Sequence, residues 1–161
     1  MFKHWKVILV LFVVLLAGCS SEMKHSDQIK EALSVMKASA ENLGVPSKTD
    51  DMLFFGTTKM NENFEIVDSL TSRFGCTATF FLKEGDDFVR IATDIIQEDH
   101  RALGTILDPN GPVIVQIRKG KPFYGVVDIL GNKYETGYEP IVDADGEIIG
   151  VYYVGYQISN K

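Results

Sequence analysis

Two hydrophobic periods divide this chain, and the change falls near residue 77. Before it, apolar residues recur at intervals of three and four, which is the spacing of one face of an α-helix. Residues 27–43 are predicted to form a first helix from the stripe Ile29, Leu33, Met36, Ala40 and Leu43. We expect Ser26 to cap this helix and Gly44 to end it. A similar stripe over residues 64–74 predicts a second helix.

Beyond this point, β-branched and aromatic residues are grouped in short runs separated by turn residues, which is typical of antiparallel strands. The predicted strands cover residues 77–82, 88–92, 122–130, 134–142 and 147–158. Between the second and third strands, the sequence predicts a polar, irregular connection over residues 93–104 and a short helix within residues 108–118. Residues 52–55 form only a short apolar piece followed by a turn. Helices segregated from an antiparallel sheet give the fold class α+β.

The N-terminus has the pattern of a bacterial lipoprotein signal peptide. Basic residues precede an apolar run over residues 7–16, which is too short to span a bilayer as a helix. The run ends in Leu16-Ala17-Gly18-Cys19, which is similar to a lipobox. We therefore expect a signal peptide over residues 1–18, a lipid on Cys19, a tether over residues 19–26 and one domain over residues 27–161. The alternatives are an ordinary cleaved signal with a chance cysteine, or an uncleaved anchor.

Charge and cysteine content narrow the range of partners and chemistries. The chain has 16 basic and 22 acidic residues and a net charge of −6, so nucleic acid is not an expected partner. With Cys19 lipidated, Cys76 stands alone, which excludes an intrachain disulfide. We expect Cys76 to be a small buried residue rather than a reactive thiol. After processing, His25 and His100 would be the only histidines, and an acylated Cys19 could not join them in a zinc site, so we expect no metal site. The sequence has no hydrolase or phosphate-loop motif, so we expect no cofactor and no enzyme activity.

Several short motifs follow one another in order between residues 55 and 156. They include Asn61-Glu62-Asn63-Phe64, Gly85-Asp86-Asp87-Phe88-Val89-Arg90, Arg101-Ala102-Leu103-Gly104-Thr105, Tyr134-Glu135-Thr136-Gly137-Tyr138 and Gly150-Val151-Tyr152-Tyr153-Val154-Gly155. Together they resemble the bacterial extracytoplasmic sensor domains called Cache domains, of the single-Cache, Cache 3/Cache 2 type. The resemblance implies a PAS-like five-stranded antiparallel sheet with a long N-terminal helix on one face. It also implies a small-ligand pocket on the other face, roofed by the connection between the second and third strands.

The chain departs from such sensor domains at both ends. They usually run into a membrane helix and a signalling module, whereas this sequence stops at Lys161, just past the last predicted strand. We therefore expect it to act through a partner, such as a membrane receptor or kinase. A lipid on Cys19 would replace the N-terminal membrane helix. The N-terminal helix is a candidate surface for a homodimer, as the resemblance implies.

Strand alternation selects candidate ligand-binding residues, because side chains two positions apart share a face of a sheet. Phe88, Arg90 and Ala92 are expected on one face, and an inward Arg90 needs an anion such as a ligand carboxylate. The candidates are Arg90, Arg101, Tyr124, Tyr134, Thr136 and Tyr138, with Thr93 and His100 as further candidates in the connection. The alternatives for Arg90 are an outward position or a structural ion pair with Asp86, Asp87 or Asp94. Arg101 and His100 could be merely solvated, and the strand residues could serve packing.

These expectations lead to one favoured function and two alternatives. The favoured function is a membrane-anchored, extracytoplasmic binding module that senses a small metabolite, with a carboxylate as the expected ligand group. The first alternative is a structural or interaction lipoprotein whose pocket is degenerate and binds no ligand. The second is a small hydrolase, although no sequence motif supports one. The sequence leaves open whether the lipid enters the inner or the outer membrane.

Overall fold

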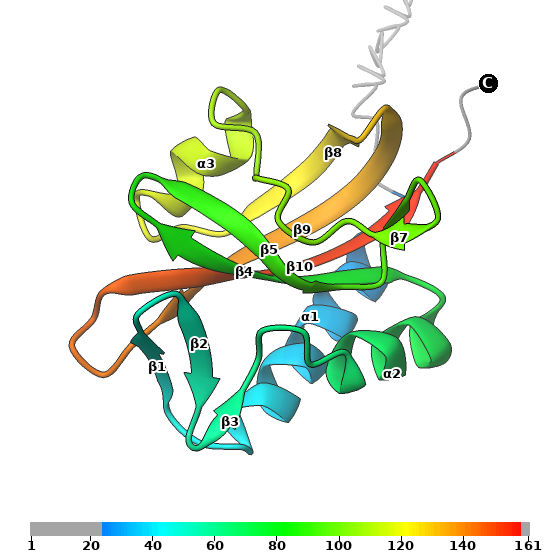
Figure 1. Ribbon diagram of the computed structural model, residues 1–161. Helices are drawn as coiled ribbons and strands as arrows, with labels where there is room; N and C mark the ends of the chain where they lie inside the picture. Colours follow the sequence, from blue (N-terminus) through cyan, green and yellow to red (C-terminus); the bar gives the residue numbers. More distant parts are fainter. Residues whose placement is uncertain (1–23, 159–161) are drawn as a thin grey trace, which may run out of the picture.

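The computed structural model describes residues 24–158, and it places one five-stranded antiparallel sheet between two layers (Figure 1). The sheet has the order β5-β4-β10-β9-β8. Its strands are β4 (Thr77–Glu84), β5 (Asp87–Thr93), β8 (Phe123–Ile129), β9 (Asn132–Val142) and β10 (Ile148–Gln157). The last strand, β10, lies in the centre and pairs with β4 and β9, with Val151 opposite Phe81 and Tyr153 opposite Tyr138. The predicted α+β class and five-stranded sheet are confirmed.

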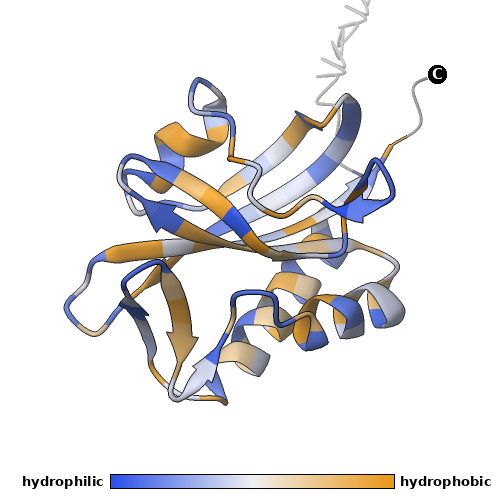
Figure 2. Cartoon of the chain, viewed as in Figure 1, coloured by the Kyte–Doolittle hydropathy of each residue, from blue (hydrophilic) through white to orange (hydrophobic). Residues whose placement is uncertain are grey.

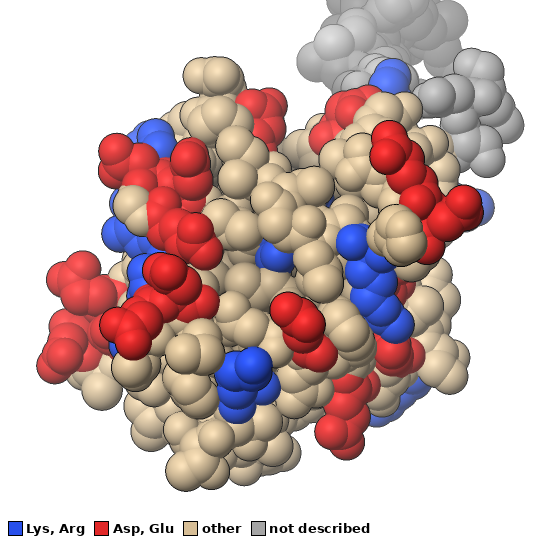
Figure 3. Space-filling view, in the orientation of Figure 1, with Lys and Arg blue, Asp and Glu red and all other residues tan. Residues whose placement is uncertain are grey.

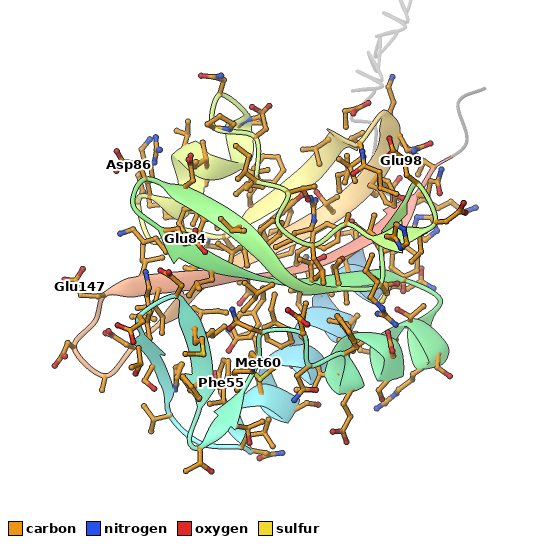
Figure 4. The ribbon with its side chains drawn as sticks, viewed as in Figure 1. Phe55, Met60, Glu84, Asp86, Glu98 and Glu147 are labelled. Atoms are coloured by element: carbon orange, nitrogen blue, oxygen red, sulfur yellow. The ribbon has the colours of Figure 1, made fainter. Side chains whose placement is uncertain are left out.

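The lower layer in Figure 1 contains the N-terminal half of the domain. Its elements are α1 (Ser26–Glu41), β1 (Pro46–Thr49), β2 (Met52–Phe55), β3 (Thr58–Lys59) and α2 (Glu65–Phe74). Phe55 and Met60 point into the core between this layer and the sheet (Figure 4). The small three-stranded sheet β1-β2-β3 was not predicted, because its strands are only two to four residues long and β1 is mostly exposed.

Helix α1 follows the predicted stripe, but its ends differ from the prediction. Ile29, Leu33, Met36 and Ala40 are buried against the sheet, whereas Leu43 is 42% exposed, because the helix ends at Glu41. Ser26 is the first helical residue rather than the cap. The backbone N–H groups just before the helix are instead satisfied by Glu135 of β9. Its carboxylate accepts hydrogen bonds from the N–H groups of Lys24 and His25 at 3.1 and 2.7 Å.

The upper layer is the connection between β5 and β8. It contains the two-residue strands β6 (Ile96–Gln97) and β7 (His100–Arg101), a loop, and the short helix α3 (Pro112–Ile117). The sequence predicted this connection to be irregular before the helix, but β6 and β7 form a small hairpin. Figure 2 shows that hydrophobic residues of α3 and the lower helices alternate with polar ones, as expected for elements that cover a sheet.

A β-bulge in β5 corrects one predicted face. The pairing shifts between Phe80 opposite Ala92 and Phe81 opposite Arg90, so Ile91 is an extra residue in the ladder. Arg90 therefore lies on the upper face with Phe81, whereas Ala92 belongs to the core beneath the sheet. The sequence prediction that Arg90 and Ala92 share a face is wrong for this reason.

Candidate functional site

A cavity of about 390 Å³ lies on the upper side of the sheet, between the β5–β8 connection and strands β8 and β9. This volume is at the lower end of the range for small-molecule sites. Most of its wall is aliphatic, and its polar wall residues are few. The lining consists of Arg90, Ile106, Leu107, Asp108, Gly111, Pro112, Val113, Val126, Val127, Asp128, Ile129, Leu130 and Tyr138.

Arg90 is the most unusual residue of this lining, because it is a buried cation that forms no ion pair with any residue of 24–158. Its side chain is only 4% exposed, and its guanidinium stacks over the Phe81 ring at 4.9 Å. Nη1 donates a hydrogen bond of 2.6 Å to Thr105 Oγ1, whereas Nε has no partner among the described residues. Within residues 24–158, no carboxylate lies within ion-pair distance of Arg90. Burial lowers the pKa of Arg90, because the charged form is less stable away from water.

The loop over Arg90 is held in place by backbone hydrogen bonds. Arg90 N–H donates to Thr105 O, and Gly104 N–H donates to Arg90 O, both at 2.9 Å. Leu107 N–H donates to Phe88 O at 2.9 Å, so the segment 104–107 runs as an added edge beside β5. The Thr105 hydroxyl in turn donates to Ala102 O. The Thr105 hydroxyl, which accepts the hydrogen bond from Arg90, is therefore held in place by the backbone hydrogen bonds of this loop.

Tyrosines of β9 and β10 belong to the same buried cluster on the upper side of the sheet as Phe81, the ring over which the guanidinium stacks. Tyr138 lines the cavity, is 1% exposed and packs against Tyr153 with ring centroids 4.9 Å apart. Burial raises the pKa of Tyr138, so its hydroxyl is neutral and can donate a hydrogen bond. Tyr134 is buried in the same cluster, but it does not line the cavity. The hydroxyl of Thr136 donates to Gly125 O at 2.8 Å, which leaves it engaged with β8.

Two of the predicted ligand-binding residues, Tyr124 and Arg101, make their contacts away from the cavity. Tyr124 faces α1, where its hydroxyl donates to Glu139 at 2.8 Å, and burial together with this bond raises its pKa to about 12. Arg101 forms a two-pronged ion pair with Asp68 of α2, at 2.7 and 2.9 Å, and stacks on Phe64 at 4.1 Å. The structure therefore does not bring Tyr124 or Arg101 to the cavity.

The two further candidates of the connection also lie outside the cavity lining. The Thr93 hydroxyl pairs with that of Thr79 at 2.7 Å, and His100 is exposed on the β6–β7 hairpin. The residues that sequence reasoning missed are Thr105, Asp108 and Asp128. Thr105 reaches Arg90 through pairing of the loop with β5, which has no local signal in the sequence. Asp108 and Asp128 lie in or beside elements that the sequence did predict, but only the tertiary arrangement shows that these segments line the cavity.

Other chemical sites were also considered over the described part of the chain. No group of three or more His, Cys, Asp or Glu residues there is placed to hold a metal ion. Cys76 is buried, as predicted, and burial followed by the charge of Asp94 raises its pKa to about 12, so the thiol stays protonated. Cys19 lies outside the described residues. Among residues 24–158, no helix combines the length and the apolar character needed to cross a membrane.

One group of acidic residues lies beside the turns at one end of the sheet. Figure 3 shows acidic side chains along the left of the molecule, where Glu84, Asp86 and Glu147 lie in Figure 4. These residues sit at or beside the β4–β5 and β9–β10 turns, and none of them lines the cavity. The cavity is therefore distinguished by its buried cation and not by the overall acidic charge.

Comparison with known proteins gives one family and two distant structural similarities. The GAF domain of A. aeolicus nlh2, in an inactive state, is 12% identical with a TM-score of 0.45, and the alignment covers 84% of this chain and 81% of that one. A Rhodococcus sp. RHA1 protein described as a candidate transcriptional regulator is also 12% identical, with a TM-score of 0.42 and coverage of 74% and 70%. A search of curated proteins finds no match. The Cache 3/Cache 2 fusion domain profile matches residues 20–161, which include the whole described domain, and this chain therefore belongs to the Cache family.

Proposed function

We propose that this protein is a lipid-anchored sensor module that binds a small carboxylate in the cavity beside Arg90 and reports its presence to a membrane partner. Cache domains are extracellular sensor domains that bind small molecules, and they are typically not enzymes. The ligand class, the lipid on Cys19 and the partner are the parts of this proposal that go beyond the family.

The observation that carries the proposal is the unpaired, buried guanidinium of Arg90 beside an open cavity. Taking an ion out of water costs several kcal/mol unless an opposite charge and hydrogen bonds compensate. Thr105 and the Phe81 ring offset part of this cost, but no residue of the described part of the chain accepts a hydrogen bond from Nε. An anion that entered the cavity from solution would compensate the charge of this guanidinium.

A carboxylate fits this position better than a single acceptor atom. Nη1 is already engaged by Thr105, whereas Nε is buried and has no acceptor among the described residues, so a ligand oxygen that reached this edge would complete its hydrogen bonding. Two parallel N–H donors of an arginine match the two oxygens of a carboxylate. Tyr138 lines the same cavity and can donate a further hydrogen bond. The aliphatic remainder of the wall suits a short hydrocarbon chain.

The presence of the cavity also weighs against a ligand-free interaction protein. In that alternative, the aromatic residues of the sheet would fill the space beside Arg90. The rings of Phe81, Tyr138 and Tyr153 do pack against one another, yet about 390 Å³ remains between Arg90 and the segment around α3.

A thermal-shift screen of the purified protein tests the proposal. Organic acids, amino acids, amines, purines and sugars are compared, and an acid at about 100 times its Kd should add about 2.7 kcal/mol to the stability of the folded state. Arg90→Lys keeps the charge but lacks the planar fork, so it should lose most of this effect. Arg73→Lys, on the opposite side of the sheet, is the matched control and should behave like wild type.

Two results would contradict the proposal: no acid stabilises the wild-type protein, or Arg90→Lys responds as wild type does. The anchoring part has a separate test. Labelled palmitate should enter the protein in cells and should be absent from Cys19→Ala. Crosslinking in intact cells, with and without the acid found in the screen, should then capture a membrane receptor or kinase.

A further inference from the structure

A turn over residues 101–105 runs between strand β7 and the segment beside Arg90. At its far end, the Thr105 hydroxyl accepts the hydrogen bond of 2.6 Å from Arg90 Nη1. Gly104 N–H donates to Arg90 O and Arg90 N–H donates to Thr105 O, both at 2.9 Å, so this end of the turn is bonded to β5. Arg101 begins the turn, four positions before Thr105. A contact that holds Arg101 therefore also restrains the hydroxyl that binds the guanidinium.

The side chain of Arg101 attaches the near end of this turn to the lower layer. Its guanidinium donates to both carboxylate oxygens of Asp68 on α2, at 2.7 and 2.9 Å. Nη1 also donates to Thr93 O at the end of β5, at 2.8 Å, and the guanidinium lies over the Phe64 ring at 4.1 Å from its centroid. Arg101 thus bridges the edge of the sheet on the side where β7 and α2 lie in Figure 1.

This ion pair is suited to holding the turn rather than to stabilising the whole domain. The side chains of Arg101 and Asp68 are 30% and 48% exposed, and an exposed ion pair contributes little to the free energy of unfolding. Its geometry is nevertheless well defined, because two parallel hydrogen bonds, the Phe64 ring and Thr93 O hold the guanidinium together. Loss of the pair should therefore loosen the turn locally and leave the sheet intact.

We propose that Arg101 and Asp68 are positioning residues for Arg90. Together they hold the 101–105 turn where the Thr105 hydroxyl can fix the guanidinium beside the cavity, although neither of them lines that cavity. This inference rests on the proposed function, from which it takes Arg90 as the residue that binds the ligand. A guanidinium that is already held in place loses less freedom when a ligand binds. The pair should therefore raise the affinity for an acid without a ligand contact of its own.

Amide hydrogen exchange and the ¹H–¹⁵N signal of Arg90 Nε–H test the inference without any ligand. In Asp68→Asn, which removes the charge and one acceptor oxygen, the N–H groups of Arg90 and Gly104 should exchange about threefold to tenfold faster, because both are bonded across the turn. Amides of the central strand β10 should keep their wild-type rates. The Nε–H signal of Arg90 should broaden, because the guanidinium gains freedom when Thr105 is no longer held.

Two further variants of α2 control for charge and for helix stability. Glu65→Gln removes a negative charge from the same first turn of α2, and Glu65 forms no ion pair within residues 24–158. It should leave the exchange rates and the Arg90 signal unchanged. Asp68→Glu keeps a carboxylate opposite Arg101 and should restore most of the wild-type behaviour.

Isothermal titration calorimetry with acetate, propionate, butyrate and succinate measures the consequence for binding. Asp68→Asn should weaken binding of an acid that binds the wild-type protein by about threefold to tenfold. Thr105→Val removes the hydroxyl directly and should weaken binding to a similar extent. The double variant should be no weaker than the weaker single variant, because both substitutions act through the same contact with Arg90.

The outcomes separate this inference from the proposed function. If the turn amides and the Arg90 signal are unchanged in Asp68→Asn, or if an acid binds that variant as tightly as wild type, the inference is wrong. It is equally wrong if the amides of β10 exchange faster to the same degree, or if Glu65→Gln has the effect of Asp68→Asn, because the pair would then be a general structural contact. If the exchange and signal results hold but none of the acids binds, the pair positions Arg90 and the result counts against the proposed function alone.

Discussion

Replacing Arg90 by methionine should make the ligand-free protein more stable while removing its response to acids. Methionine is unbranched and apolar and has a similar reach, so it can fill the space over Phe81 without a charge. A buried charge without its partner costs about 3–5 kcal/mol. In the wild-type protein this cost is only partly offset, because Nε has no acceptor within residues 24–158 and burial lowers the pKa of Arg90.

The interactions that the substitution removes are smaller. The hydrogen bond from Nη1 to Thr105 contributes about 1.5–3 kcal/mol as a bond from a charged donor. The contact of the guanidinium with Phe81 contributes roughly 0.5–2 kcal/mol, and a methionine sulfur regains about 0.3–1.5 kcal/mol on the same ring. Thr105 keeps its own bond to Ala102 O, so no hydroxyl donor is orphaned. We expect Arg90→Met to gain about 1 kcal/mol, and Tm to rise by roughly 2–4 °C.

Urea unfolding in a buffer free of carboxylates measures this difference directly, and Arg73→Met on the exposed side of α2 controls for the loss of an arginine. If Arg90→Met is instead destabilised by more than about 1 kcal/mol, Arg90 contributes net stability to the fold. The argument that it is held in readiness for a ligand would then be refuted.

Three further predictions concern the rest of the domain. Burial alone would raise the pKa of Glu135, but hydrogen bonds from His25 and Lys24 lower it overall, below its usual 4.5. The ionised carboxylate therefore stabilises the folded state above about pH 4.5, and the stability advantage of wild type over Glu135→Gln should shrink in acid denaturation as the pH falls below that value. An alanine at Gly137 would place its Cβ 2.6 and 2.7 Å from two side chains of α1, so Gly137→Ala should cost about 1–3 kcal/mol in urea unfolding; an unchanged midpoint would show that α1 is not tightly seated. In a Cys19→Ala background, a thiol reagent at neutral pH should label Cys76 only after unfolding, because burial raises the pKa of the thiol to about 12; rapid labelling of the native protein would contradict its burial.

Most of the fold was predictable because its signals are local. The stripe of α1, the alternation along β9 and the turns between β8, β9 and β10 each involve residues close together in sequence. The pairing of β4 with β10 joins residues about seventy positions apart, such as Phe81 and Val151, and only the family resemblance supplied it. The bulge at Ile91 has no mark in the sequence, which is why Ala92 was placed on the wrong face.

The site was predictable only in part, for a related reason. An arginine within an apolar strand marks Arg90 from the sequence alone. Where the other polar side chains point depends on tertiary partners. Arg101 meets Asp68, which is 33 positions away, and Tyr124 meets Glu139 beneath the sheet. Alternation grouped Tyr134, Thr136 and Tyr138 on one face of their strand, and the structure brings Tyr138 of this group to the same cavity as Arg90.

The most direct test of the account is the ¹H–¹⁵N resonance of the Arg90 Nε–H group, which has no acceptor among the described residues. The signal can be assigned by its loss in Arg90→Lys. During titration with an acid that stabilises the protein, this resonance should move downfield and saturate with the Kd measured by calorimetry. An Nε–H resonance that stays in place while the acid binds would mean that the carboxylate is held elsewhere, and it would contradict the central claim.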